Sequence, residues 1–367
     1  MNVRQSSSSR HPFASRKHRG HAGSPAAIEP LEGRQLMSVS LLVPAVRPYG
    51  IVAVGDLNGD SKGDSVRALN FTRVSSGRDG LTRTPVAALT VQLGKGDGTF
   101  GDGSVRFLLP AVQIAQVATG DFDGDGSVHV ALVEGARSAQ PGAVHLLKGN
   151  GDGTLQPHVL AGEFKGITGE LHAADFNGDG VTDLAVEQRG IIAILIGLLR
   201  QQKFADQQTA ILPYVEQGVR DVAAGDFNND GRADIAAVLG DGSVRVALND
   251  KQLNFTDQGA VDDGFKGGVF VAAGDVNGDG FHDLAAFGDG SVFVALGSDR
   301  GLVPAVRTEI NFLPAVQRNL HLADINGDGR ADLVFGDFLG RAHVLGYGQK
   351  DGTFLIGGKT GSNDVLG

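Results

Sequence analysis

The chain has 367 residues, 56 of them glycine, with no cysteine, no tryptophan and a formal net charge of -10 at pH 7. The lack of cysteine excludes disulfides and thiolate metal sites, and the acidic charge argues against nucleic acid or an anionic membrane surface as a partner. No apolar run reaches the ~18 residues that a membrane-spanning helix needs, so we expect no membrane span.

The first 39 residues differ in composition from the rest of the chain. They are rich in serine and carry six Lys/Arg residues against two glutamates. We predict a disordered basic leader, without the continuous apolar core of an ordinary signal peptide. Within it, IEPLEGRQLMS at residues 28–38 resembles a short motif that precedes large extracellular repeat proteins of planctomycete bacteria. The resemblance implies a secreted or cell-surface protein; the alternative is an unrelated polar leader.

The rest of the chain, residues 40–367, contains a nine-residue acidic segment in six copies. They are DLNGDSKGD from Asp56, DFDGDGSVH from Asp121, DFNGDGVTD from Asp175, DFNNDGRAD from Asp226, DVNGDGFHD from Asp275 and DINGDGRAD from Asp324. Successive copies start 65, 54, 51, 49 and 49 residues apart. This period is typical of β-propeller blades and too long for most helical repeats.

The segments around each copy predict four antiparallel strands. A short apolar run such as VAAGD (222–226) precedes the loop, and a second run such as DIAAVL (234–239) follows it. Asp-Gly turns then lead to a third strand, as in GDGSVRVAL (240–248), and to a fourth, as in VRFLLP (105–110). Six such units predict an all-β, six-bladed propeller, with a seven-bladed ring or an open array as alternatives.

A further strand is predicted before the first loop. SLLVPAV at residues 40–46 is similar to RFLLPAV (106–112), which holds a fourth-strand position. We therefore expect residues 40–46 to complete the last blade and close the ring.

The repeated loop has the donor pattern of a calcium site. With its positions numbered 1 to 9, Asp or Asn side chains at 1, 3, 5 and 9 and the carbonyl of position 7 supply the hard oxygen ligands that Ca²⁺ prefers. About five to six ions are expected. The predicted ligands are Asp56, Asn58, Asp60, Lys62, Asp64, Asp121, Asp123, Asp125, Ser127, Asp175, Asn177, Asp179, Val181, Asp183, Asp226, Asn228, Asp230, Arg232, Asp234, Asp275, Asn277, Asp279, Phe281, Asp283, Asp324, Asn326, Asp328, Arg330 and Asp332.

An EF-hand or dockerin shares the opening of this pattern. However, an EF-hand carries a bidentate Glu at position 12 and flanking helices, whereas Val186 and Ala237 hold that position here and the flanks predict strands.

At blade spacing, the loop pattern resembles that of the FG-GAP/VCBS repeat family, which includes integrin α-subunit propellers and many bacterial extracellular proteins. The resemblance covers roughly residues 40 to 360 and implies a calcium-bearing propeller. Two departures stand out. Gly-Ala-Pro is absent, which favours the bacterial variant over an adhesion receptor, and the second loop ends in His129, a poor calcium ligand.

Residues where the repeats differ are the candidates for ligand binding. The first repeat carries an insertion at 70–85 with Arg73, Arg78 and Arg83, and the second a shorter one at 134–142. His172 and His321 each lie three residues before a loop, in blades that would face each other across a six-bladed channel.

No catalytic motif occurs, so we expect no enzyme. The expected function is a binding, adhesion or structural module at the cell surface, with a protein or another cell-surface ligand. The alternative is a carbohydrate-binding or polysaccharide-active protein. Tyr49, Tyr214 and Tyr347 are the three tyrosines of a chain that lacks Trp, so few of the aromatic platforms usual in glycan sites are available.

Overall fold

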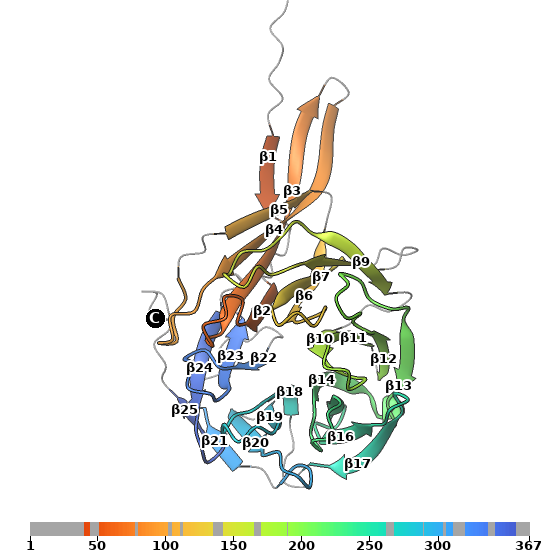
Figure 1. The fold of residues 1–367 in the computed structure, drawn as a ribbon, viewed down its shortest axis with the longest axis vertical. Helices are drawn as coiled ribbons and strands as arrows, with labels where there is room; N and C mark the ends of the chain where they lie inside the picture. The colour runs from red at the N-terminus through yellow and green to blue at the C-terminus, as the bar shows by residue number, and fades with distance from the viewer. Residues whose placement is uncertain are drawn as a thin grey trace, which may run out of the picture. The chain divides into compact units, whose positions relative to one another are not determined.

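A computed structural model describes residues 40–44, 51–77, 80–101, 105–110, 113–134, 142–164, 170–188, 190–261, 268–288, 290–303, 306–310, 320–336 and 342–356. These residues form β-strands and one short 3-10 helix, η1 (Val215–Gln217) (Figure 1). None of them forms a helix long and apolar enough to cross a membrane. The predicted leader and Arg78 lie outside the described residues.

The strands form six antiparallel sheets, each containing a blade of four consecutive strands; β1 (Ser40–Pro44) is a fifth strand in the sheet of blade one. Blades one and two contain β2 (Ile51–Gly55), β3 (Asp64–Gly77), β4 (Gly80–Gln92) and β5 (Val105–Pro110), then β6 (Ile114–Gly120), β7 (His129–Glu134), β8 (Gly142–Leu147) and β9 (Val159–Phe164). Blades three and four contain β10 (Glu170–Ala174), β11 (Asp183–Gln188), β12 (Ile191–Leu195) and β13 (Gln208–Ile211), then β14 (Val219–Gly225), β15 (Asp234–Leu239), β16 (Val244–Asn249) and β17 (Phe255–Ala260). Blades five and six contain β18 (Gly268–Gly274), β19 (Asp283–Gly288), β20 (Ser291–Ala295) and β21 (Val306–Glu309), then β22 (Leu320–Ala323), β23 (Asp332–Gly336), β24 (Ala342–Gly348) and β25 (Phe354–Ile356).

The first strands of all six blades surround one central cavity. Residues of β2, β6, β10, β14, β18 and β22 line it together, and Figure 1 shows the blades arranged around it. The six-bladed propeller is therefore confirmed, and the seven-bladed and open alternatives are wrong.

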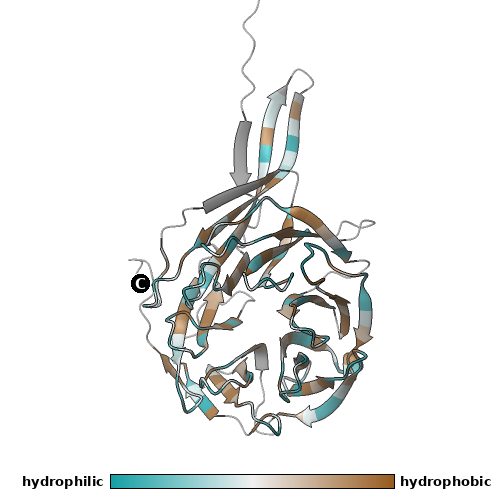
Figure 2. Cartoon of the chain, in the orientation of Figure 1, coloured by the Kyte–Doolittle hydropathy of each residue, from teal (hydrophilic) through white to brown (hydrophobic). Residues whose placement is uncertain are grey.

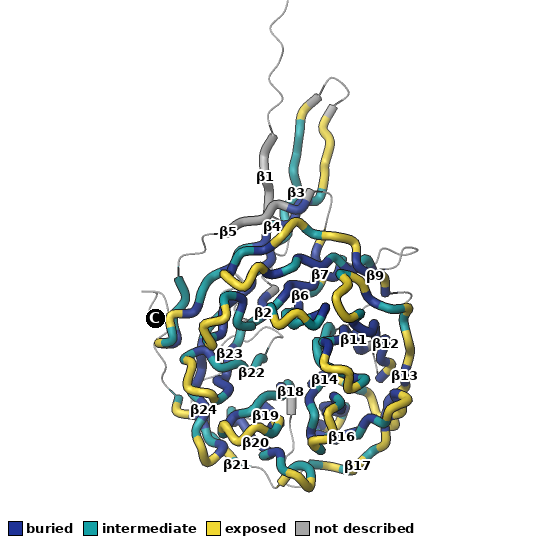
Figure 3. Tube along the Cα trace, in the orientation of Figure 1, coloured by how far each residue is buried: buried dark blue, intermediate teal, exposed yellow. Residues whose placement is uncertain are grey.

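Burial decreases from the middle strands of a blade to its outer strand. In blade four every residue of β15 is buried, whereas β17 alternates between exposed and half-buried positions after Phe255. The middle strands pack on both faces against neighbouring blades, so they are apolar throughout, and the outer strand has one face in solvent. Figure 2 shows hydrophobic residues along the strands, and Figure 3 shows the connecting loops exposed.

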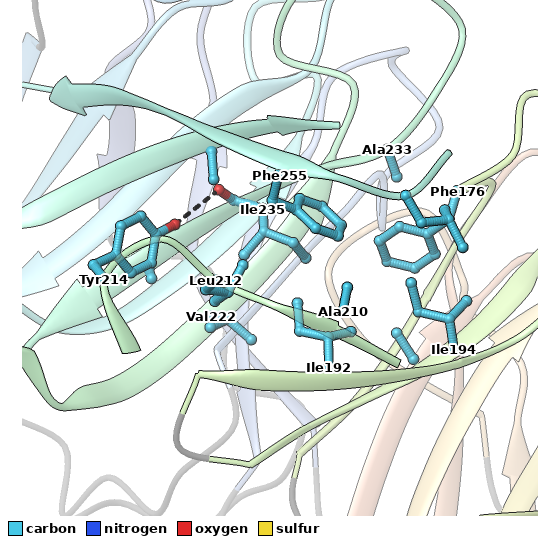
Figure 4. Close-up of a cluster of buried hydrophobic side chains, with 14 of the residues drawn as sticks. Phe176, Ile192, Ile194, Ala210, Leu212, Tyr214, Val222, Ala233, Ile235 and Phe255 are labelled. Carbon is cyan, nitrogen blue, oxygen red and sulfur yellow. Dashed lines mark hydrogen bonds between the residues drawn. The ribbon is translucent and has the colours of Figure 1, made fainter. Parts of the chain in front are cut away.

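The hydrophobic core lies between adjacent blades. In the cluster of Figure 4, Phe176 and Ile194 of blade three pack with Ile235 of blade four. The hydroxyl of Tyr214, itself 1% exposed, donates a hydrogen bond to the carbonyl oxygen of Ile235 at 3.5 Å. Phe176 is the second residue of its loop, so the loop is anchored directly in this core.

Backbone hydrogen bonds join the loops of neighbouring blades. The N–H of position 8 donates to the carbonyl of position 1 in the preceding blade, from Thr182 to Asp121 at 2.9 Å and from Ala233 to Asp175 at 2.7 Å. The same bond joins blade one to blade six, where the N–H of Gly63 donates to the carbonyl of Asp324 at 2.6 Å. The ring is thus closed by the same contact that joins blade two to three, three to four and five to six.

The strand predicted to close the ring lies elsewhere. β1 (Ser40–Pro44) pairs with the outer half of β3, from Ser40 opposite Ser75 to Pro44 opposite Phe71, and the fourth strand of blade six is β25. The prediction of closure by residues 40–46 was wrong. β3 has 14 residues and β2 has five, so β2 leaves the outer half of β3 with an open edge, and β1 pairs with that edge.

We expect Phe176→Ala to lower the free energy of unfolding by about 3–5 kcal/mol, because it removes a fully buried ring at the junction of two blades. Urea unfolding followed by circular dichroism measures this loss. Leu160→Ala is the control, since Leu160 is 58% exposed and its truncation should change stability by less than about 0.5 kcal/mol. Equal losses in the two variants would contradict the assignment of the core.

Candidate functional site

Each acidic loop joins the first two strands of its blade and is organised by its first aspartate. In loop three, Oδ1 of Asp175 accepts hydrogen bonds from the N–H groups of Gly178 and Asp179 at 2.7 and 3.2 Å, and Oδ2 accepts one from Gly180 at 2.7 Å. Gly180, at position 6, has φ 82°, which explains the predicted preference for glycine. Ser61 adopts the same left-handed conformation at position 6 of loop one.

The side chains at positions 3 and 5 continue this pattern. Oδ1 of Asn177 accepts the N–H of Asp179 at 2.8 Å, and Oδ1 of Asp179 accepts the N–H of Val181 at 2.9 Å. These local bonds turn successive side-chain oxygens toward the inside of the loop, as in other Asx turns. The loops of blades one, four, five and six repeat both bonds.

The aspartate at position 9 has a structural function that the sequence analysis missed. Asp183 is fully buried; its Oδ2 accepts the N–H of Phe176 at 2.9 Å, and its Oδ1 accepts the N–H of Gly197 at 2.7 Å. One carboxylate thus ties the start of the loop and the end of the third strand to the second strand. The same pair of bonds is made by Asp64, Asp183, Asp234, Asp283 and Asp332.

Burial raises the pKa of Asp183 to about 7, although the two backbone hydrogen bonds oppose this shift. The nearby carboxylates of Asp175 and Asp179 raise it further. The pKa values of the other four ninth-position aspartates are raised to about 6 or 7 for the same reasons. A cation among these groups would stabilise the ionised form and lower the pKa again.

The side chains at position 7 do not behave alike. Arg232, Arg330 and Lys62 form ion pairs with the fifth-position aspartate of their own loops, whereas Val181 is 2% exposed and packs inward. This variety agrees with a function for the backbone carbonyl alone, which stays a prediction.

The second loop departs from the others. Its Asp121, Asp123, Asp125 and His129 bring one ligand atom each within 4.8 Å of one another, close enough to hold a metal ion. His129 is fully buried, with Nε2 at 3.6 Å from Oδ1 of Asp123 and Nδ1 at 3.8 Å from Oδ1 of Asp121. Lys148, which the sequence analysis did not single out, lies at the same cluster.

The donors of the other five loops fit a hard cation. Each loop offers two carboxylates and an amide around one turn, with a third carboxylate beneath it, and no nitrogen or sulfur ligand is required. Each carboxylate oxygen that accepts one N–H keeps capacity for another partner. The residues therefore suit Ca²⁺, and the ligand set predicted from the sequence stays a prediction.

The central cavity has a volume of about 220 Å³ and polar groups in its wall. His172 and His321, on β10 and β22, both line it. Burial lowers the pKa of each to about 4, and the proximity of His321 contributes to the shift of His172. Both imidazoles are thus neutral at pH 7. Within the described part of the chain, neither Nε2 atom has a hydrogen-bond partner.

A carboxyl pair lies in the same wall. Asp221 of β14 is 7% exposed, and its Oδ2 accepts the N–H of Val271 at 2.7 Å. Burial, followed by a hydrogen bond with the carboxyl of Glu170, raises the pKa of Asp221 far above its ordinary value of 3.8. The sequence contained a signal for this pair, because the fifth residue before the loop is acidic in blades three and four, as Glu170 and Asp221, and in none of the other repeats.

The insertion in blade one forms the outer halves of β3 and β4, a two-stranded extension whose register runs to Gly77 opposite Gly80. Arg73 lies opposite Thr84, and Arg83 lies opposite Val74. Directly opposed residues share a face and neighbouring residues alternate, so Arg73 and Arg83 lie on opposite faces. These two arginines do not form one basic patch.

Comparisons with known proteins agree with the repeat and the fold. Residues 226–286 and 275–335 match the family model of the FG-GAP-like repeat, which supports the resemblance to the FG-GAP repeat family. No curated protein matches the chain. A solved structure of an Agrocybe aegerita lectin, described as recognising non-reducing terminal N-acetylglucosamine, is 20% identical with a TM-score of 0.51, over 84% of this chain and 79% of the lectin.

The pore of the Photorhabdus luminescens Tc holotoxin is 16% identical with a TM-score of 0.42, over 84% of this chain and 14% of that one. At 20% identity, the likeness to the lectin shows the fold alone.

We expect Asp221→Asn to remove one source of pH dependence. The pKa of Asp221 is higher in the folded state than in the unfolded state, so its contribution to stability is present below about pH 4 and is lost as the pH rises through the raised pKa. Asn keeps an acceptor for Val271 and cannot ionise. The difference between the melting temperatures, variant minus wild type, should therefore increase as the pH rises from about 5 to about 8. Parallel curves for the two proteins would show that Asp221 does not titrate in this way.

Proposed function

We propose that this chain, whose fourth to sixth loops match the FG-GAP-like repeat, is a calcium-stabilised propeller that acts outside the cell as a binding or structural module. The observation that carries the proposal is the repeated arrangement of three carboxylates, one of them buried. In loop three, Asp175 and Asp179 each raise the pKa of the buried Asp183. Such a group is stable in its ionised form when a cation neutralises it, so cation binding and folding are coupled.

The outer strands support a protein partner. Ile191 and Ile211 lie directly opposite each other on β12 and β13 and are 37% and 63% exposed. Leu160, on β9 of the preceding blade, is 58% exposed. Among the described residues, the large hydrophobic side chains that are exposed are aliphatic, which suits a protein contact better than a sugar ring.

An extracellular location is part of the proposal. It is supported by the match to the FG-GAP-like repeat and by the resemblance of residues 28–38 to a motif of extracellular repeat proteins. A chain without cysteine gains no disulfides outside the cell, so cations in the loops would be its main cross-links.

We expect chelation of calcium to lower the melting temperature of the full chain, because it leaves the carboxylates of each loop unneutralised. Asp179→Ala should lose part of the rise that calcium produces and change little in chelator, since Asp179 is exposed. Asp183→Ala should lower the melting temperature in both conditions, because the N–H groups of Phe176 and Gly197 lose a buried acceptor, at about 1–3 kcal/mol each. Differential scanning calorimetry measures all three proteins.

The contrast between the two variants separates a metal ligand from a structural carboxylate. A melting temperature that does not respond to chelation in the wild type would contradict calcium stabilisation, whatever the two variants do.

A second candidate function is carbohydrate binding. One observation favours it: the lectin of Agrocybe aegerita, described as recognising N-acetylglucosamine, has a similar fold over most of this chain. Against it, the exposed large hydrophobic side chains of the described residues include no aromatic ring on which a sugar could stack.

We expect the calcium-loaded protein to give no signal on a glycan array, because the aromatic contacts of a sugar site are missing from its described surface. If the wild type bound glycans ending in N-acetylglucosamine and Ile211→Ser kept this binding, carbohydrate binding would become the favoured function over binding of a protein partner. Ile211→Ser is the matched variant, since it changes the exposed aliphatic pair and leaves the loops intact.

A further inference from the structure

Three residues distinguish the second blade from the other five. Position 3 of its loop is Asp123 where the others have Asn, and position 9 is His129 where the others have Asp. The third change lies outside the loop, at the residue before the glycine or asparagine that follows the third strand. Here blade two has Lys148, and the other blades have Leu93, Ile196, Leu248, Leu296 and Tyr347.

The structure brings these three residues together. Nζ of Lys148 lies 2.6 Å from Oδ2 of Asp123 and 2.5 Å from Oδ2 of Asp125. The side chain of Asp123 is 3% exposed and that of Lys148 is 20% exposed, so the contact between them is largely shielded from solvent, whereas the side chain of Asp125 is 31% exposed. Both hydrogen bonds raise the pKa of Lys148 above its ordinary value, so the ammonium stays charged at neutral pH.

The contact differs from the other ion pairs of the loops. Lys62, Arg232 and Arg330 come from position 7 and each contacts the carboxylate at position 5. Lys148 comes from the end of β8 and bridges the carboxylates of positions 3 and 5. Two carboxylates that a metal ion would join are therefore joined by an ammonium.

The charges of the loops agree with this exchange. Loop two has acidic residues at positions 1, 3 and 5, and the other five have them at positions 1, 5 and 9. Each loop thus carries three carboxylates that need a cation. In blade two the third carboxylate has moved from the buried ninth position to the position that Lys148 reaches, and the His129 ring occupies the buried place.

We infer that the loop of the second blade is metal-independent: the Lys148 ammonium takes the place of the metal ion, and His129 fills the space of the ninth-position aspartate. The comparison with the other loops rests on the proposed function, in which those loops hold calcium. The carboxylates of the second loop are then neutralised by the ammonium of Lys148, whereas those of the other loops are neutralised by Ca²⁺.

Two variants of the full chain test this inference. Lys148→Met removes the ammonium and should lower the melting temperature in chelator by at least about 2 °C, because the buried carboxylate of Asp123 and the neighbouring carboxylate of Asp125 lose their cation. Lys95→Met, at an exposed lysine of blade one, is the control and should not change it. His129→Asp combined with Lys148→Leu restores the carboxylate at position 9 and removes the ammonium, and it leaves Asp123 where the other blades have Asn. This double variant should bind one calcium ion per chain more than the wild type in equilibrium dialysis.

Three results would overturn the inference. Lys148→Met could melt like Lys95→Met in chelator, or the double variant could bind the same number of calcium ions as the wild type while the wild type binds calcium. The wild type could also take up one Zn²⁺ or Mn²⁺ per chain that His129→Ala loses, which would make loop two a transition-metal site. If neither the wild type nor the double variant binds calcium, the proposed function fails, and the melting temperature of Lys148→Met in chelator still decides the function of the ammonium.

Discussion

The interaction on which five of the six blades depend is the pair of hydrogen bonds made by a buried aspartate at position 9. In blade four, Oδ2 of Asp234 accepts the N–H of Phe227 at 3.0 Å and Oδ1 accepts the N–H of Asn249 at 2.8 Å. The carboxylate sits at the start of the second strand and holds both the beginning of the loop and the end of the third strand. Three segments of a blade thus meet at one side chain whose burial is costly unless its oxygens are satisfied.

This interaction connects the acidic loop, which is the candidate cation site, to the hydrophobic core and to the joints between blades. The residue whose N–H is held, Phe227, is buried in the core, and the loop that it begins carries the carboxylates at positions 1 and 5. The residue just before the aspartate, Ala233, donates its N–H to the carbonyl of Asp175 in the preceding blade. A cation bound in the loop would therefore neutralise charge close to the hydrophobic core and to the joint with the preceding blade. Calcium stabilisation of one loop should for this reason be transmitted to two blades.

The number of blades could be predicted from the sequence, because each repeat carries its own loop, turn and strand signals. The course of β1 could not. The sequence of β1 is similar to that of a fourth strand, but the strand with which it pairs depends on the length of β3. The sequence analysis interpreted residues 70–85 as an inserted loop and so did not predict the outer half of β3. Alternation in NFTRVSS and LTRTPVA is compatible with two paired strands, and the insertion was judged by its difference from the other repeats instead.

The candidate site was predictable to a different degree in each part. Oxygen donors at fixed spacing predict a hard-cation loop from the residues alone. The structural function of Asp183 could not be separated from metal binding, since both require a carboxylate at the same place. The pairing of Glu170 with Asp221, and of Lys148 with Asp123, depends on which strands become neighbours in space. The available signals were two acidic residues at equivalent positions of blades three and four, and two residues of blade two that no other repeat has at those positions.

The joint between blades six and one shows how strongly the ring depends on its loops. The chain crosses from blade to blade at five joints. At the sixth joint, between blades six and one, the described strands of each blade all come from one end of the chain. Two hydrogen bonds cross this joint. The N–H of Gly63 donates to the carbonyl of Asp324 at 2.6 Å, and the hydroxyl of Tyr347 donates to the carbonyl of Asp97 at 3.1 Å. A Cβ at Gly63 would lie 2.6 Å from Cδ1 of Ile325, so the two loops approach here as closely as a glycine permits. Because no chain segment passes directly between these two blades, the contacts of their loops and the hydrophobic cluster that includes Ile325 and Val54 keep the ring closed.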